Sequence, residues 1–214
     1  MKRFVLGIVL AVGATSAQAD IYGLVANRTA DVLSAPPTTI AGGISIEGDI
    51  TTFAGQFGYK THQNLVTFGT LGFVDLDGVD SGISIGGGLV YQLAESPLDH
   101  YNMAIKGSYH RFSGDTSTGD FTGSDFGVEV IASPVDQKVV NGGDVFGFIG
   151  LHRLYGKATG TGFGTTVSAS DTETELAIGA GVIVPWSGGE LFGTIELIDD
   201  VFIGGGYRVE WGAP

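Results

Sequence analysis

The sequence predicts an all-β protein: a transmembrane, antiparallel, up-and-down β-barrel of eight to ten strands, with ten favoured, behind a cleaved signal peptide. Apolar residues recur at every second position through most of the chain, which is the period of a β-strand. Hydrophobic residues make up 43% of the 214 residues, charged residues only 15%, and 37 positions are Gly. Soluble domains usually carry about 25% charged residues. No apolar run approaches the ~20 residues of a membrane helix, so membrane-spanning strands explain the composition best.

The first 19 residues have the pattern of a secretory signal peptide. Lys2 and Arg3 precede an apolar run at residues 4–14, and Ala17 and Ala19 place small side chains at −3 and −1 of a cleavage site. The run would span only about 16 Å, which is too short for an anchor helix in a ~30 Å hydrocarbon core. We therefore divide the chain into a signal peptide (1–19), an N-terminal lead-in segment (20–38), a β-barrel (39–211) and a C-terminal tail (212–214).

The last predicted strand shows the alternation most clearly. Its apolar face carries Val201, Ile203, Gly205, Tyr207, Val209 and Trp211. Similar alternation, weaker in some cases, defines ten segments: 40–48, 53–60, 64–75, 83–93, 101–110, 121–132, 145–157, 173–184, 191–197 and 201–211. After residue 20 the sequence has no convincing 3.6-residue period, so we expect little helix.

The faces opposite the apolar ones are rich in Gly, Ala, Ser and Thr, with one or two charges per strand. A soluble sandwich would expose more Lys, Glu and Arg there, whereas a narrow barrel lumen requires small side chains. Aromatic residues lie toward the strand ends, as in the girdles at membrane interfaces: Tyr59, Tyr91, Tyr101, Tyr109, Tyr155, Tyr207 and Trp211.

The connections between strands fall into two alternating classes. Polar connections at 75–82, 113–120 and 158–170 alternate with connections that contain proline at 95–100, 133–144 and 185–189. An even number of strands returns the C-terminus to the side of the N-terminus. The connections with proline are therefore expected in the periplasm, and the polar ones outside the cell.

With its signal peptide and repeated two-residue period, the chain resembles small Gram-negative outer-membrane β-barrels of the OmpA/OmpX-like and porin-like class. Its last strand resembles their C-terminal assembly signal, carried here by Ile203, Gly205, Tyr207, Val209 and Trp211. Three residues, 212–214, follow the aromatic residue that usually ends such chains. The resemblance implies residence in the outer membrane, contact with its lipid and lipopolysaccharide, and recognition by the barrel-assembly machinery.

Few residues indicate catalysis or metal binding. None of the four histidines has a second ligand at metal-binding spacing on its own strand face, so no metal site and no cofactor are predicted. His110, with Ser113 and Asp115 nearby, is the only conceivable hydrolytic group, and no catalytic residue is predicted.

Asp75, Asp77 and Asp80 loosely resemble a calcium loop, but the spacing of an EF-hand is not met. We interpret them as an acidic external hairpin that divalent ions could visit. The chain has no cysteine, which excludes disulfides, iron–sulfur clusters and thiol nucleophiles.

Charged residues on the predicted lumen faces form a more informative set. Centring the connections at 113–120 and 158–170 places Lys106 opposite Glu129 and Arg153 opposite Glu175. Because a buried charge is costly unless paired, we predict two cross-strand ion pairs in the lumen. Glu196 and Arg208 complete the predicted lumen charges. Such pairs would either fill the lumen as a polar plug, which we favour, or act as a selectivity element in a narrow pore.

These observations predict a non-enzymatic, monomeric outer-membrane barrel that serves envelope structure, surface interaction or slow passage of small solutes. A lipid-modifying barrel enzyme and a secreted soluble β-barrel or sandwich binding protein are the alternatives. The net charge of −13 argues against a nucleic-acid partner.

Overall fold

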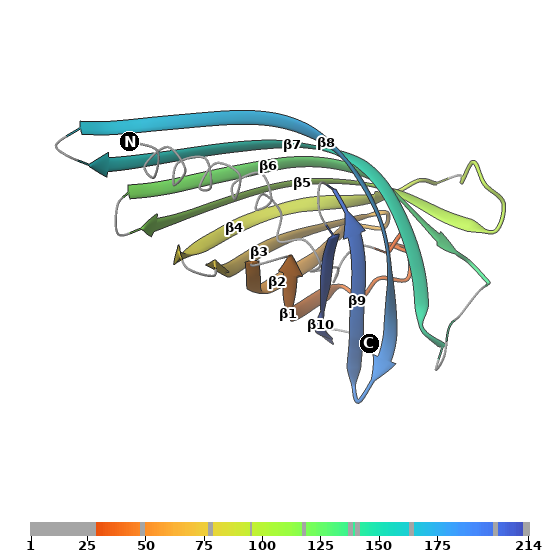
Figure 1. The fold of residues 1–214 in the computed structure, drawn as a ribbon. Coiled ribbons are helices and arrows are strands. Elements are labelled where there is room, and N and C mark those ends of the chain that lie inside the picture. The colour runs from red at the N-terminus through yellow and green to blue at the C-terminus, as the bar shows by residue number, and fades with distance from the viewer. Residues whose placement is uncertain are drawn as a thin grey trace.

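The protein is a closed barrel of ten antiparallel strands in which each strand pairs with its neighbours in the sequence (Figure 1). The computed structural model describes residues 29–47, 50–76, 79–94, 96–116, 119–136, 139, 142–162, 165–198 and 201–211. The prediction of an all-β, up-and-down barrel with ten strands is confirmed. The strands are β1 (Thr38–Glu47), β2 (Ile50–His62), β3 (Leu65–Leu76), β4 (Val79–Gln92), β5 (Tyr101–Thr116), β6 (Gly119–Pro134), β7 (Asp144–Gly162), β8 (Thr165–Trp186), β9 (Gly189–Leu197) and β10 (Val201–Trp211).

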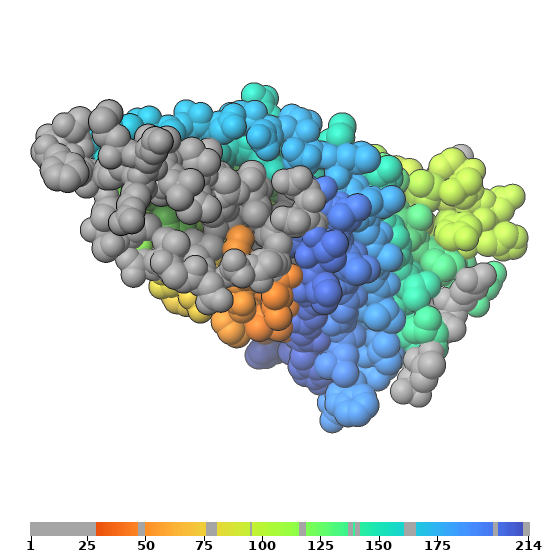
Figure 2. Space-filling view, viewed as in Figure 1, coloured from red at the N-terminus to blue at the C-terminus, as the bar shows by residue number. Residues whose placement is uncertain are grey.

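Pairing between the first and last strands closes the barrel. Their register runs from Thr38 opposite Trp211 to Ile46 opposite Ile203. In the space-filling view, the orange surface of the first strands lies directly against the dark blue surface of β10 (Figure 2). Closure removes the unpaired edges that an open ten-stranded sheet would have along these strands.

The barrel has two different ends. One, which we call the terminal end, holds the start of β1, the end of β10, and the connections that contain proline. The other, the hairpin end, holds the connections predicted to be polar external loops. There β5 and β6 pair as far as Thr116 and Gly119, and β7 and β8 pair as far as Gly162 and Thr165.

The polar connections at 75–82, 113–120 and 158–170 are therefore mostly strand, and the prediction that they are loops is wrong. Backbone pairing does not require apolar side chains, so polar residues can continue a hairpin beyond the apolar belt. The longest strand is β8. It pairs with β9 only from Ile178 onward, so its residues 165–177 extend past the end of β9.

Large apolar side chains cover the outside of the barrel. Leu71, Ile83 and Ile203 are 62%, 61% and 61% exposed, and similar residues occur on all ten strands. Such a belt is unfavourable in water and favourable against lipid, so the barrel is of the transmembrane type. Most of the predicted girdle residues lie on this outer surface, including Tyr59, Tyr91, Tyr101, Tyr109, Tyr155 and Trp211.

No helix in the described part of the chain is long and apolar enough to cross a membrane.

Residues 29–37, the described part of the predicted lead-in, enter the terminal end of the barrel. We call them the mouth segment. Ala30 N donates a hydrogen bond to Ser133 Oγ (3.1 Å), and Leu33 N donates one to Gln92 Oε1 (2.8 Å). Lys60 Nζ donates to the carbonyl oxygen of Leu33 at 2.7 Å. Three strands, β2, β4 and β6, thus hold the segment. The predicted signal peptide (1–19), residues 20–28 and the tail (212–214) lie outside the described residues.

Candidate functional site

The interior of the barrel is layered along its axis. On β5 the inward-facing residues run from Ala104 at the terminal end, through Lys106, Ser108 and His110, to Phe112 near the hairpin end; all are buried. The same order of apolar, polar and apolar residues recurs on β6. A central group of charged and imidazole side chains therefore lies between two apolar groups. We call it the charged layer, and its members are Lys106, Asp125, Glu129, His152 and Glu196.

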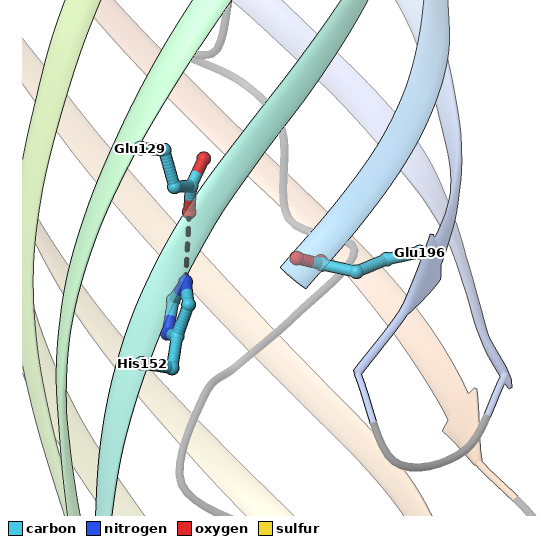
Figure 3. A group of neighbouring side chains, drawn as sticks. All are labelled: Glu129, His152 and Glu196. Atoms are coloured by element: carbon cyan, nitrogen blue, oxygen red, sulfur yellow. Dashed lines mark ion pairs between the residues drawn. The ribbon is translucent and has the colours of Figure 1, made fainter. Parts of the chain in front are cut away.

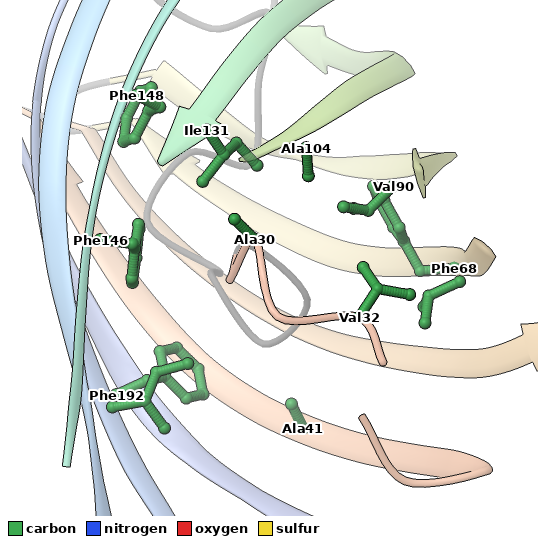
Figure 4. Packing of buried hydrophobic residues seen from close by; sticks show 12 residues of the cluster. Ala30, Val32, Ala41, Phe68, Val90, Ala104, Ile131, Phe146, Phe148 and Phe192 are labelled. Carbon is green, nitrogen blue, oxygen red and sulfur yellow. The ribbon is translucent and has the colours of Figure 1, made fainter. Parts of the chain in front are cut away.

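An apolar cluster fills the terminal side of the charged layer. It joins Val66, Phe68, Val90, Ile131, Phe146, Phe148 and Phe192 to Ala30 and Val32 of the mouth segment. Figure 4 shows the chain that carries Ala30 and Val32 inside the ring of strands, among these side chains. On the hairpin side, the rings of Phe112 and Phe121 contact each other at a tilt of 45°, with centroids 5.3 Å apart, and pack with Val74.

Lys106 and Glu129 form an ion pair inside the barrel. They are direct cross-strand partners on β5 and β6, and Lys106 Nζ lies 2.8 Å from Glu129 Oε1. The two side chains are 7% and 0% exposed. The register places them as the sequence analysis expects, since the β5–β6 turn is symmetric about residues 117 and 118.

His152 bridges two carboxyl groups of β6. Its Nδ1 lies 2.9 Å from Asp125 Oδ2, and its Nε2 lies 3.4 Å from Glu129 Oε1. His152 and Asp125 are both 0% exposed. Both ring nitrogens of His152 therefore face carboxylate oxygens, and such contacts hold the imidazole ring in one orientation.

Glycines on the neighbouring strands provide the space for these side chains. Gly127 of β6 is the cross-strand partner of His152, and a Cβ on Gly127 would overlap the imidazole ring. Gly150 of β7 is the partner of Glu129, and a Cβ there would lie 2.8 Å from Glu129 Cγ. Part of the glycine excess therefore serves the packing of large lumen side chains against the opposite backbone.

Glu196 reaches the same region from β9. Figure 3 shows its carboxylate directed toward Glu129 and His152 across the lumen. One ligand atom from each of these three residues lies within 4.8 Å of the others, and all three residues are buried. Glu196 is one of the lumen charges predicted from the sequence, whereas its proximity to Glu129 and His152 was not predicted.

Arg208 pairs with a different carboxylate. Its Nε contacts Glu190 Oε2 on the adjacent strand β9, near the terminal end. Arg208 is 9% exposed and also lines a cleft of about 110 Å³ together with Asp31, Tyr59 and Glu210. Arg208 thus faces the interior but lies apart from the charged layer.

The predicted pairing of Arg153 with Glu175 is wrong. Arg153 is opposite Thr174, and Glu175 is opposite His152. The β7–β8 hairpin turns between Gly162 and Thr165, half a residue before the assumed centre at 164. A shift of one residue in register moves a side chain to the other face, so Arg153 is exposed on the outer surface.

The other candidate residues do not converge. His110 faces the lumen, with Thr70 Oγ1 3.4 Å from its Nδ1, whereas Ser113 and Asp115 are exposed. The odd-numbered positions of β5 point away from the even-numbered ones, so these three residues form no catalytic group. Of the acidic candidates for a metal, Asp75 is exposed, while Asp77 and the side chain of Asp80 lie outside the described residues.

The residues of the predicted assembly signal lie on one face of β10. Ile203 and Trp211 are 61% and 70% exposed on the outer surface. Tyr207 is less exposed because its hydroxyl donates to the carbonyl oxygens of Trp186 and Ser187, at 3.3 and 3.1 Å. This contact connects β10 to the turn between β8 and β9.

Sequence reasoning missed the arrangement around His152 because its partners are not on its own strand. Asp125 and Glu129 are on β6 and Glu196 is on β9. A search for ligands at fixed spacing along one strand cannot find them. The sequence also contained no direct signal for the group, because the assumed centre of the β7–β8 hairpin placed Arg153 instead of His152 on the lumen face.

No protein-family model matches the chain, and no curated protein matches it. Among solved structures, the KdgM porin in complex with disordered oligogalacturonate is similar, with 7% identity and a TM-score of 0.44 over 81% of this chain and 99% of that chain. The translocator domain of autotransporter NalP from Neisseria meningitidis has 16% identity and a TM-score of 0.46, over 97% and 94% of the two chains. The N-terminal β-barrel domain of Pseudomonas aeruginosa OprF has 11% identity and a TM-score of 0.32, over 80% and 96%. These structures are outer-membrane β-barrels, and the likeness concerns the fold alone.

Proposed function

We propose that the protein is a non-enzymatic barrel of the Gram-negative outer membrane that serves envelope structure and surface interaction, with its lumen closed to solutes. The observation that carries the proposal is the filled interior. The side chains of the charged layer are buried: Lys106, Glu129, His152 and Glu196 are each at most 5% exposed. A conducting pore instead requires a continuous path of water between the side chains that line the lumen.

The mouth segment adds a second closure at the terminal end. Ala30 and Val32 are 0% and 3% exposed within the apolar cluster. Hydrogen bonds from Lys60 and to Ser133 and Gln92 hold its backbone against three strands. With the terminal end in the periplasm, this segment would close the barrel on that side.

Burial also argues against an enzyme. Asp125 and His152 resemble the acid–base part of a catalytic triad, but both are 0% exposed. A substrate in the membrane or outside the cell would not reach them. The remaining candidate, His110, is separated from Ser113 and Asp115 by the alternation of β5.

A planar-bilayer recording tests closure. Purified protein, with its folded state verified by heat-modifiable gel mobility, is expected to give no steady conductance steps above those of detergent alone. Steady, reproducible steps would contradict closure and would favour slow passage of small solutes through the lumen.

Surface interaction is supported by three cations on the outer surface near the hairpin end. Arg111 of β5 and Arg153 and Lys157 of β7 are exposed. Arg153 and Lys157 flank Tyr155, and Arg111 lies in the same cross-strand row as Tyr155, two strands away. Strand geometry places the three Cα atoms roughly 12–13 Å apart. We call Arg111, Arg153 and Lys157 the basic triad.

The basic triad is an exception on this acidic chain. The other described Lys and Arg residues, namely Lys60, Lys106 and Arg208, have inward-facing or hydrogen-bonded side chains. Cations at the edge of an apolar belt attract anionic headgroups through charge-assisted hydrogen bonds. The phosphates of lipopolysaccharide, with the hairpin end outside the cell, are the partner that fits this position.

Thermal unfolding in defined vesicles tests this partner. Lipopolysaccharide is expected to raise the unfolding temperature more than phosphatidylcholine does, and dephosphorylated lipopolysaccharide should lose most of that effect. A variant with Arg111→Gln, Arg153→Gln and Lys157→Gln should lose the phosphate-dependent part. An unchanged response in the triple variant would contradict a role for the basic triad.

A further inference from the structure

We propose that Glu129, His152 and Glu196 form a zinc-binding site inside the barrel. Each residue offers one ligand atom, the three atoms lie within 4.8 Å of one another, and each residue comes from a different strand, β6, β7 or β9 (Figure 3). The site lies inside the charged layer that supports the proposed closure, and it is separate from the basic triad.

The distance between two of the ligand atoms matches the separation of neighbouring ligands around zinc. His152 Nε2 and Glu129 Oε1 are 3.4 Å apart. An N–H···O hydrogen bond usually measures about 2.9–3.0 Å between heavy atoms. Bonds of about 2.0–2.1 Å from zinc in tetrahedral geometry put neighbouring ligands about 3.3 Å apart. The pair therefore has the spacing of one edge of a zinc tetrahedron.

A second partner holds each of these two ligands. Asp125 Oδ2 lies 2.9 Å from His152 Nδ1, so Asp125 holds the ring through the nitrogen that is not the proposed ligand. This carboxylate–histidine arrangement accompanies most zinc-bound histidines. Lys106 Nζ lies 2.8 Å from Glu129 Oε1. A carboxylate has about four lone-pair positions, so Glu129 can accept this hydrogen bond and still coordinate a metal.

Glu196 supplies the third ligand from β9, which is separated from β7 by one strand, β8. A separation of up to 4.8 Å exceeds the zinc edge by about 1.5 Å. Binding of zinc by all three residues would therefore require the Glu196 carboxylate to lie closer to the other two ligands. A metal held in this way would connect β6 and β7 to β9 through the interior.

The donor set favours Zn²⁺ over Mg²⁺ and Ca²⁺. One imidazole nitrogen with two carboxylate oxygens suits zinc, whereas Mg²⁺ and Ca²⁺ prefer oxygen ligands alone. Because the site is buried, the metal would enter while the barrel folds.

The test is metal content after folding. The full chain is refolded in detergent with equimolar Zn²⁺ or with chelator, washed extensively, and measured by elemental mass spectrometry, with heat-modifiable gel mobility as the check of folding. We expect one Zn²⁺ per folded chain and a higher unfolding temperature for the zinc-loaded protein. With a water as the fourth ligand, refolding with Co²⁺ should give the intense visible absorption of a four-coordinate site. Folded wild type without stoichiometric zinc would overturn the proposal.

Variants locate the metal. His152→Gln and Glu196→Gln are each expected to lower zinc affinity at least tenfold. His100→Gln is the matched control, because exposed His100 lies 3.6 Å from Asp136 and could bind zinc adventitiously. Glu175→Gln is a second control, since Glu175 is the cross-strand partner of His152 but is not in the group. Both controls should keep full zinc binding.

Asp125→Asn provides a test if His152→Gln fails to fold. Asp125 is a positioning residue, so this variant should still bind one zinc with affinity about 10–100-fold lower. Two outcomes would contradict a metal at Glu129, His152 and Glu196. One is wild-type zinc affinity in Asp125→Asn and Glu196→Gln, and the other is loss of zinc binding in His100→Gln.

Discussion

The imidazole of His152 lies against the backbone of Gly127 on the adjacent strand, so closely that a Cβ at position 127 would overlap the ring. Gly127 therefore fixes the side-chain position on which the contacts of His152 with Asp125 and Glu129 depend. The charged layer requires small residues as much as it requires charged ones.

Substitution of Gly127 tests this dependence. Gly127→Ala should displace His152 and cost about 1–3 kcal/mol of unfolding free energy, as overpacking does in protein interiors. Gly107→Ala is the matched control, because no atom would lie within 4 Å of a Cβ there, and its effect should stay within about 0.5 kcal/mol. Denaturant unfolding in detergent measures both. Equal effects would contradict the role of Gly127.

The ion pair between Lys106 and Glu129 should show strong coupling. Lys106→Met leaves a buried carboxylate without its ammonium partner and should cost about 3–5 kcal/mol. Combining it with Glu129→Gln removes the unbalanced charge, so the double variant should be more stable than the sum of the single effects predicts. A double-mutant cycle measures this difference, and additive effects would exclude a direct interaction.

The register of β7 and β8 predicts the opposite result for Arg153 and Glu175. The two residues are not cross-strand partners, and Arg153 is exposed on the outer surface. The cycle of Arg153→Gln and Glu175→Gln should give a coupling energy within about 0.5 kcal/mol. A coupling comparable to that of Lys106 and Glu129 would mean that the strands pair one residue out of this register.

Neighbouring residues of the mouth segment should differ sharply. Val32 is 3% exposed in the apolar cluster and Leu33 is 56% exposed. Val32→Asn places an amide in apolar surroundings, so the segment should leave the mouth more often. Cleavage within residues 29–37 by a nonspecific protease should become at least about tenfold faster, which corresponds to 1.4 kcal/mol. Leu33→Asn should leave the rate nearly unchanged, and similar rates for both variants would argue against docking.

The alternation of side chains predicts the fold well because it depends only on local sequence. Every second residue of β10 faces outward whatever the neighbouring strands do, so the strand and its outer face follow from the sequence. The Lys106–Glu129 pair could also be anticipated, because the turn that connects their strands is short and symmetric.

Long-range geometry explains what the sequence could not predict. The predicted centre of the β7–β8 hairpin was wrong by half a residue. Arg153 was therefore predicted to face the lumen, whereas the structure places His152 there. His152 then joins Asp125, Glu129 and Glu196, a group whose formation requires the registers of several strands and the curvature of the barrel together. Polar strand extensions were missed for a different reason, since hydropathy does not distinguish them from loops.

The extension of β8 past β9 has a consequence for contacts between copies of the protein. From 165 to 177 this strand lies beyond its pairing with β9, and long unprotected strand edges tend to recruit further strands. Asp171, Glu173 and Glu175 lie along this stretch. If a second copy paired its own β8 with this edge, the carboxylates of the two strands would lie close together and repel each other. This repulsion would oppose edge-to-edge association of the barrels.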